Sequence, residues 1–537
     1  MKPHHAALFG AKTPFRSLRD GLKRPTWAIL GVGLLGAGLT ILAAFSLGQR
    51  PADPAEWTSL ARPPQVRPDY RGIVIPPNIA PLNFAVEEAA TGYCVQVRAG
   101  DDQAITVHSC DGGIRLPLRP WKALLDQNRG RRLEVDVFIR DEDGRWQLFE
   151  PLEWTVAAEE IDSHLVYRLL GPTFSTYKHL GIYQRDLAAY EESPVLFGGS
   201  FEQGCTNCHA FANNRPEPFL LHVRPGLDES VAPGMIVVRD GKAARVNTRI
   251  GPISNPAGYT AWHPGGEVAV FSINDTVQYM HGAGKETREV YDRNSDLAIV
   301  DFRTGAVSND PAIADPARLE TFPAWSPDGK HLYFCSAPSL WEQVKDSLLG
   351  DYKQVKYDLM RVGYDAAANQ WGKPETLLAS ADTGKSILQP RPSPDGRYLL
   401  FCMCDHGPFP AFREDADLYL MDLSNRSYRR LEANSPRSES WHAWSSNSRW
   451  IVFESRRDNG HVAWPYLCYL DASGREHRPF LLPQKDPRFY ETCLKTFNLP
   501  EFVTGPITVP EREILRAVRS APPEGVPRPS GGSTARE

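Results

Sequence analysis

The residues best suited to chemistry lie between Gly204 and Asn213, in the stretch GCTNCHAFAN. Two residues separate Cys205 from Cys208, and His209 follows directly. With 9 cysteines and 14 histidines among 537 residues, this pattern is expected by chance roughly 0.004 times in the chain. In c-type haem attachment, two thiols add to the vinyl groups of a porphyrin while the adjacent imidazole binds the iron. The pattern therefore predicts one covalent haem c, held by Cys205 and Cys208, with His209 as proximal iron ligand.

Three other interpretations of the motif remain open. A structural zinc site would need a second close pair of cysteine or histidine residues, and the nearest downstream histidine, His222, stands alone. A redox dithiol of the thioredoxin type would need a βαβ context, which the flanking residues do not indicate. The third alternative is a pair of plain structural cysteines.

The sixth iron ligand decides between electron transfer and ligand binding. His281 is the first candidate and Met280 the alternative, because both lie in VQYMHGAG, whose glycines predict a loop. His222 and Met235 are further candidates. A methionine would raise the redox potential and a second histidine would lower it, whereas an open position would allow gas sensing or catalysis.

The remaining cysteines fit an oxidising compartment outside the cytosol. Cys94 and Cys110 fall on neighbouring expected strands, and a hairpin could bring them close enough for a disulfide. Cys335 and Cys402 occupy the same place in successive repeats, where copper or zinc binding is the alternative to simple packing. Buried thiols behave as small hydrophobic groups, so packing is the expected role.

A candidate membrane span lies near the N-terminus. Residues 26–48, TWAILGVGLLGAGLTILAAFSLG, carry no charge and are long enough to cross about 30 Å of hydrocarbon as a helix. An excess of basic residues before it predicts that residues 1–25 stay in the cytoplasm. These basic residues are Lys2, Lys12, Arg16, Arg19, Lys23 and Arg24. We therefore expect a single-pass anchor in the bacterial inner membrane with the bulk of the chain in the periplasm; a cleaved signal peptide is the alternative.

The composition outside this segment narrows the partners. Residues 49–68 are rich in proline and lack apolar periodicity, which predicts an extended tether. The net charge is −5 and 23% of the residues are charged, so nothing indicates nucleic-acid binding.

An internal repeat organises the second half of the chain. The copies AWHPGGEVAVF, AWSPDGKHLYF, RPSPDGRYLLF and AWSSNSRWIVF begin at Ala261, Ala324, Arg391 and Ala443. In each, a turn precedes a strand that alternates β-branched and aromatic residues, and a second strand follows. Such spaced multi-strand copies are typical of propeller blades. Residues 216–505 are therefore expected to form a five- or six-bladed β-propeller, closed by a strand from the far end of the chain.

The remaining segments complete a mainly β fold. PFLLHVRP and GMIVVRDGKAARV look like a first blade that lacks its inner or outer strand. Residues 69–160 alternate strongly and contain one short helix, PWKALLDQN, which predicts a β-sandwich-like domain. Residues 161–215 are expected to form a helical haem-attachment segment. Residues 506–537 are expected to be a helical end and a disordered tail.

Several of these stretches together resemble a known family. PPNIAPLNF, IYQRDL, CTNCH, the WSPDG repeats and FYETCLKTFNLPE are similar to bacterial TolB-like, WD-type β-propeller proteins that carry a single c-type haem motif. The resemblance covers the chain from about Asp69 to Phe502. It implies an envelope location, a propeller and a covalent haem, but it implies no reaction. The last repeat departs from the pattern, with Ser445 to Ser448 in place of Ser-Pro-Asp-Gly.

Two classes of function follow from these features. The first is a membrane-anchored periplasmic monohaem cytochrome whose propeller docks a redox partner and which passes electrons without making or breaking bonds. The second is a TolB-like envelope scaffold in which the haem is structural or sensory. No hydrolase, phosphate-loop, metalloprotease or dinucleotide motif is present. An electron-transfer or binding protein is therefore expected rather than a catalyst.

Overall fold

The computed structural model describes residues 53–100, 104–172, 180–224, 231, 233–248, 250, 257–281, 288–340 and 352–521. The chain divides into two units, Met1–Ala55 and Glu56–Glu537, and the elements below belong to the second. The expected membrane span at residues 26–48 lies outside the described residues. Within the described ranges, no helix combines the length and the apolar character that crossing a bilayer requires.

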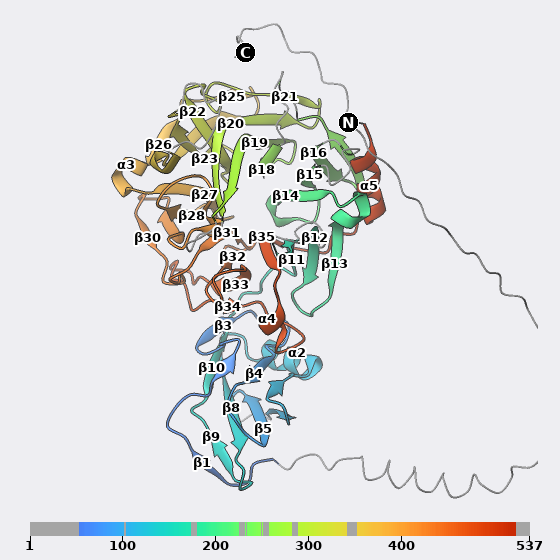
Figure 1. Cartoon of the computed structure of the whole chain (residues 1–537), viewed down its shortest axis with the longest axis vertical. Coiled ribbons are helices and arrows are strands. Elements are labelled where there is room, and N and C mark those ends of the chain that lie inside the picture. The colour runs from blue at the N-terminus through green and yellow to red at the C-terminus, as the bar shows by residue number, and fades with distance from the viewer. Residues whose placement is uncertain are drawn as a thin grey trace, which may run out of the picture. The chain divides into compact units, whose positions relative to one another are not determined.

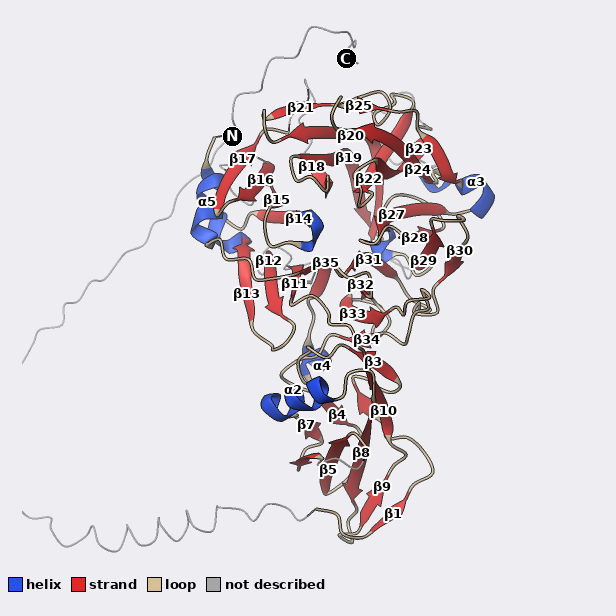
Figure 2. Ribbon diagram, turned by 180° about the vertical axis from the view of Figure 1, so that it is seen from behind, coloured by secondary structure: helices blue, strands red, loops and turns tan. Residues whose placement is uncertain are grey.

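Six antiparallel sheets form a ring that is a β-propeller (Figures 1 and 2). Five of these sheets have four strands and one has five. In every blade but the first, the strands follow one another along the chain from the innermost strand outward. The second blade contains β14 Cys205–Phe211, β15 Phe219–Arg224, β16 Gly234–Arg239 and β17 Lys242–Val246, and the third contains β18 Ala257–Trp262, β19 Val268–Met280, β20 Arg288–Asp301 and β21 Ala306–Ser308. The fourth blade contains β22 Arg318–Trp325, β23 His331–Pro338, β24 Asp358–Asp365, β25 Gln370–Trp371 and β26 Glu375–Leu378. The fifth contains β27 Ser386–Pro392, β28 Tyr398–Cys404, β29 Asp417–Asp422 and β30 Tyr428–Arg430, and the sixth contains β31 Glu439–Trp444, β32 Trp450–Ser455, β33 Trp464–Tyr469 and β34 Phe480–Leu481.

The first blade is completed by the far end of the chain. It contains β11 (His164–Leu170), β12 (Gly181–Asp186), β13 (Glu192–Phe197) and β35 (Thr496–Val503), in the order β13-β12-β11-β35. Strand β35 runs antiparallel to β11, with Val503 opposite His164. The expected closure of the ring by a late strand is confirmed.

The expected helical segment at residues 161–215 is wrong for the residues that the structure describes there. These residues form β11, β12, β13 and β14, with one short 3₁₀ turn, η2 (Gly198–Phe201). The blade is covered on both faces, so β11 buries residues on both sides and shows no clean alternation. A short apolar run of this kind is compatible with either a buried strand or a helix. Strand β14 also supplies the inner strand that the first recognisable blade lacked in the sequence.

The repeat turns share one conformation. Gly266, Gly329 and Gly396 have positive φ angles of 74°, 70° and 74°, and each donates its N–H to the carbonyl three residues earlier. Ser448 makes the same turn in the last blade with φ 60° and the same hydrogen bond, from its N–H to the carbonyl of Ser445. The last blade thus has different turn residues, Ser445 to Ser448, but the same turn conformation.

The segment before the propeller is also mainly β. A seven-stranded sheet and a three-stranded sheet share one core with α2 (Leu118–Gln127). Trp121 of α2 and Trp154 are fully buried, and their rings meet edge to face at 5.8 Å. The seven-stranded sheet contains β1 Trp57–Ser59, β3 Ile73–Ile75, β5 Gly92–Arg98, β6 Ile105–Ser109, β8 Arg132–Arg140, β9 Trp146–Leu148 and β10 Leu152–Val156, and the smaller sheet contains β2 Val66–Arg67, β4 Phe84–Val86 and β7 Gly113–Ile114.

Short helices complete the described chain. Helix α5 (Glu511–Arg519) packs Ile514, Ala517 and Val518 into the core of the first two blades. The remaining helices of the propeller are brief turns between strands. They are η3 Ala212–Asn214, η4 Tyr352–Gln354, η5 Pro410–Phe412, α3 Ser380–Thr383 and α4 Phe489–Thr492.

The expected disulfide between Cys94 and Cys110 is not formed. The register places Cys94 on β5 opposite His108 on β6, and Cys110 lies beyond the end of β6 as an exposed, free thiol. Neighbouring strands alone do not bring two sulfur atoms into bonding geometry; the residues must also lie opposite each other.

The thiols differ enough in burial for a chemical test. Burial raises the pKa of Cys335, Cys402 and Cys468 well above the usual range, whereas Cys110 is exposed. Only a thiolate reacts quickly with an alkylating reagent. We expect iodoacetamide to modify Cys110 in the native protein and the three buried thiols only after denaturation, as read by peptide mass spectrometry. Modification of Cys402 at the native rate of Cys110 would contradict this packing.

Candidate functional site

Each of the six innermost strands has the same irregularity where it faces the axis of the ring. In each blade, two residues of the inner strand stand opposite one residue of the next strand, which is the pattern of a β-bulge. The bulged pairs are Asn207 and Cys208, Tyr259 and Thr260, Phe322 and Pro323, Gln389 and Pro390, Trp441 and His442, and Leu499 and Pro500. The second cysteine of the motif therefore occupies a bulge on the propeller axis.

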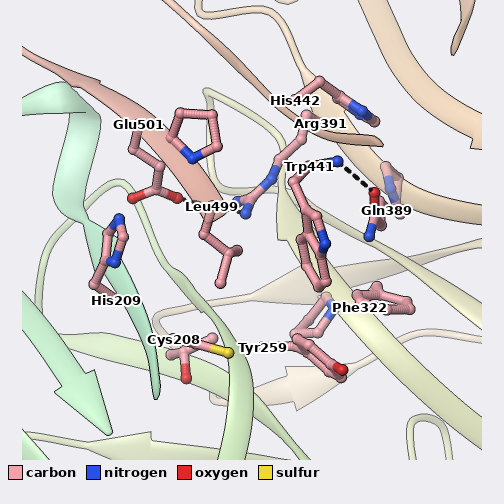
Figure 3. Close-up of a pocket in the computed structure, with 14 residues that line it drawn as sticks. Cys208, His209, Tyr259, Phe322, Gln389, Arg391, Trp441, His442, Leu499 and Glu501 are labelled. Atoms are coloured by element: carbon pink, nitrogen blue, oxygen red, sulfur yellow. Dashed lines mark hydrogen bonds and ion pairs between the residues drawn. The ribbon is translucent and has the colours of Figure 1, made fainter. Parts of the chain in front are cut away.

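A cavity lies on the axis at the level of these bulges. It is narrow, with a volume of about 20 Å³, and the residues that line it are bulge residues or their immediate successors (Figure 3). Cys208 and His209 contribute to its wall. The structure thus places two of the three motif residues on the central cavity of the propeller.

His209 is buried without a hydrogen bond of good geometry. Its side chain is only 2% exposed, and neither ring nitrogen makes a hydrogen bond of good geometry within the described residues, although the backbone carbonyls of Leu499 and Val166 are near enough to interact with the ring. Burial lowers its pKa to about 3, helped by the charges of Arg391 and Arg168, while the nearby carbonyls of Leu499 and Val166 act in the opposite direction. The imidazole is therefore neutral at physiological pH, with a nitrogen lone pair that no donor occupies.

The two motif cysteines share a charged neighbour. Arg168 of β11 places Nη2 3.6 Å from Sγ of Cys205, and Arg224 stands directly opposite Cys205 in the β14–β15 ladder. Burial raises the pKa of Cys208, and the charges of Arg168 and Arg224 partly offset this effect. Arg168 thus contacts Cys205 and acts electrostatically on both Cys208 and His209.

These residues fit the donor set of a c-type haem. Cys205 and Cys208 are both free thiols, and His209 offers unpaired ring nitrogens in the protonation state that binds iron. The axial cavity lies directly against Cys208 and His209. A zinc site is a poorer fit, because the motif residues belong to no group of three or more His, Cys, Asp or Glu ligand atoms within 4.8 Å of one another in the described ranges.

Two charged residues on the axis escaped the sequence analysis. The position after each bulge is alanine in three blades, but it is His209, Arg391 and Glu501 in the other three. Nη2 of Arg391 lies 3.4 Å from Oε1 of Glu501, while Oε2 of Glu501 makes no hydrogen bond of good geometry within the described residues. Burial raises the pKa of Glu501 to about 7, against the opposing effects of Arg391 and the backbone of Phe211. The sequence did contain a signal for Arg391, because Arg391 begins one of the four repeat copies and the other three copies begin with alanine.

A second cavity continues the first along the axis. It has a volume of about 410 Å³ and shares Thr260, Arg391 and Glu501 with the smaller one. Pro264, Pro327 and Pro394, from the turns that follow the inner strands, line its outer part. The charged pair therefore lies where the narrow cavity meets a wider mouth at the carboxyl ends of the inner strands.

The expected distal ligands lie elsewhere. Met280 is 52% exposed at the end of β19, and Nε2 of the adjacent His281 lies 3.5 Å from Oε2 of Glu289. Neither residue lines either cavity. Of the other histidines, His222 shares a hydrogen bond of 2.7 Å with the Thr260 hydroxyl.

One histidine on the axis was missed by the sequence analysis. His442 lines the same cavity as His209, but its Nε2 lies 3.2 Å from the carbonyl oxygen of Leu400. His442 directly precedes the repeat copy that begins at Ala443, and a single histidine beside a tryptophan carries no motif.

Comparisons with solved structures found chains of low similarity to this one. The chain resembles the Dos1 propeller (TM-score 0.32, 13% identity, covering 52% of this chain and 62% of that one). It also resembles an oligogalacturonate lyase from Vibrio parahaemolyticus (TM-score 0.33, 11% identity, 72% and 100%). A third similar structure is the Cps50 (Swd1) β-propeller domain of Myceliophteria thermophila (TM-score 0.30, 13% identity, 62% and 91%). Searches against protein-family models and curated proteins gave no match.

Proposed function

We propose that this protein is a c-type cytochrome built on a β-propeller, with one haem joined to Cys205 and Cys208 and its iron bound by His209. It transfers single electrons to or from a redox partner that docks on the propeller. The motif favours this function, and the TolB-like resemblance implies the covalent haem but no reaction. The haem would supply the electron-accepting centre, and the chain supplies the attachment, the axial ligand and the surrounding charge.

One observation carries the proposal. His209 is 2% exposed and neither of its ring nitrogens makes a hydrogen bond of good geometry within the described residues, although a buried imidazole with poor hydrogen bonds is costly. A metal bond to one nitrogen would remove that cost. The same strand holds two free thiols at the spacing that haem attachment requires.

The proposed location follows from the chemistry and the N-terminal sequence. We place the propeller in the periplasm, held to the inner membrane by residues 26–48, because those residues form an uncharged stretch preceded by basic residues. A chain that ends up outside the cytosol can meet the apparatus that attaches c-type haem.

The test is the mass and the spectrum of the exported protein. Expression in a host that matures c-type cytochromes should give a red protein whose mass exceeds that of the exported polypeptide by one haem. We expect its absorption spectrum to change reversibly between oxidised and reduced states and to ignore carbon monoxide if a sixth ligand is bound. Rapid carbon monoxide uptake would instead indicate sensing or catalysis, and a haem that resists reduction would indicate a structural role. A colourless protein at the polypeptide mass would disprove the proposal.

A further inference from the structure

The propeller axis carries an arginine directly across the ring from His209. Successive inner strands contact one another around the ring in the order β14, β18, β22, β27, β31 and β35. His209 lies on β14 and Arg391 on β27, three blades away in a ring of six, so the two residues face each other across the channel. Figure 3 shows the guanidinium of Arg391 directed toward the carboxylate of Glu501, which lies beside His209.

The positive charge of Arg391 is poorly balanced. Of the described residues that line the two cavities, Glu501 is the sole carboxylate, and it meets Arg391 through one contact of 3.4 Å instead of a bidentate pair. Burial and the charge of Arg391 lower the pKa of His442, so this neighbour on the cavity wall adds no charge of its own. The Arg391 side chain is 29% exposed, so N–H groups that Glu501 does not bind are open to a ligand in the channel.

The channel has room beside this arginine. Three of the six positions after the bulges are alanines, namely Ala261, Ala324 and Ala443, and all three line the wider cavity. Short side chains there leave space at the level where Arg391 enters. The ligand that best matches a guanidinium fork is a carboxylate, which can accept two parallel hydrogen bonds.

We propose that Arg391 binds a carboxylate on the propeller axis. Two sources have this chemistry: a propionate of the proposed haem, which Cys205 and Cys208 would attach to β14, or a free small carboxylate that enters through the wider cavity. The first source rests on the proposed function, and the second does not.

The experiment uses two forms of the protein and acetate as the probe. The haem-free form carries Cys205→Ala and Cys208→Ala, and the other form is the protein from a maturation-competent host. Acetate is titrated against chloride at equal ionic strength and followed by tryptophan fluorescence, because Trp441 lines the narrow cavity. Midpoint potentials are measured for the haem-bearing protein. Each form is compared with Arg391→Gln, Arg391→Lys and the exposed control Arg132→Gln, whose ion pair with Glu153 lies in the segment before the propeller.

A free carboxylate predicts that both forms bind acetate and that Arg391→Gln weakens binding at least tenfold. A haem propionate predicts that only the haem-free form binds acetate. In that case Arg391→Gln lowers the midpoint potential by about 59 mV, a tenfold change for one electron, because an unbalanced propionate favours the oxidised iron. Arg391→Lys should retain part of either effect, and Arg132→Gln should change neither.

The proposal is overturned if acetate binding does not depend on Arg391 in either form and the potential of Arg391→Gln equals that of the parent. A chain that never gains haem but binds acetate through Arg391 would disprove the cytochrome and support the carboxylate site. Thermal melting of each variant shows whether it is folded. If Arg391→Gln does not fold, the comparison with Arg391→Lys still tests the proposal.

Discussion

Replacement of Cys205 and Cys208 by alanine is expected to abolish covalent haem attachment. The two thiols are the only groups on β14 that can form thioether bonds, and Cys208 and His209 face the axial cavity. We expect the doubly substituted protein from a maturation-competent host to have the bare polypeptide mass and no visible absorbance. Each single substitution should leave at most one thioether bond and a much lower yield of coloured protein.

The matched control is Cys110→Ala, which removes an exposed free thiol from the segment before the propeller. It should retain the mass and spectrum of the parent. His209→Ala separates attachment from iron binding, because it keeps both sulfur atoms and removes the imidazole. We expect this variant to keep its haem but to show the spectrum of an iron that has lost a strong axial ligand. Normal haem content in the double cysteine variant would refute the attachment site.

Removal of β35 is expected to destroy the folded propeller. A chain that ends at Lys495 loses the inner strand of the first blade and leaves one edge of β11 unpaired. Phe497, Leu499, Phe502 and Val503 are all buried, and at about 1.5 to 3 kcal/mol each their loss amounts to roughly 10 kcal/mol. That is comparable with the entire stability of a typical domain, about 5 to 15 kcal/mol. We expect insoluble protein, or protein without near-ultraviolet circular dichroism or a cooperative thermal transition.

The control for this truncation is a chain that ends at Ala521, which keeps every described element including α5. Its melting temperature should match that of the full chain. If the chain that ends at Lys495 melts cooperatively within a few degrees of the control, the ring does not depend on β35 for closure.

Most of the propeller could be predicted from the sequence because its blades repeat. The copies that begin at Ala261, Ala324, Arg391 and Ala443 each show a turn followed by an alternating strand, and the structure places β19, β23, β28 and β32 there. Turn chemistry and period-two patterning are local properties, so they can be read without knowledge of the fold. The first blade has no such turn, and its strands are buried on both faces, which is why residues 161–215 were mistaken for helix.

The candidate site, too, was only partly predictable from the sequence. The sequence by itself determined the motif of Cys205, Cys208 and His209, since thioether chemistry depends on a fixed spacing along the chain. Only the tertiary structure placed that motif on the propeller axis, separated it from Met280 and His281, and brought Arg391 and Glu501 to its cavity. These residues come from blades that are distant in sequence, and their meeting depends on ring closure, which no local pattern of side chains specifies.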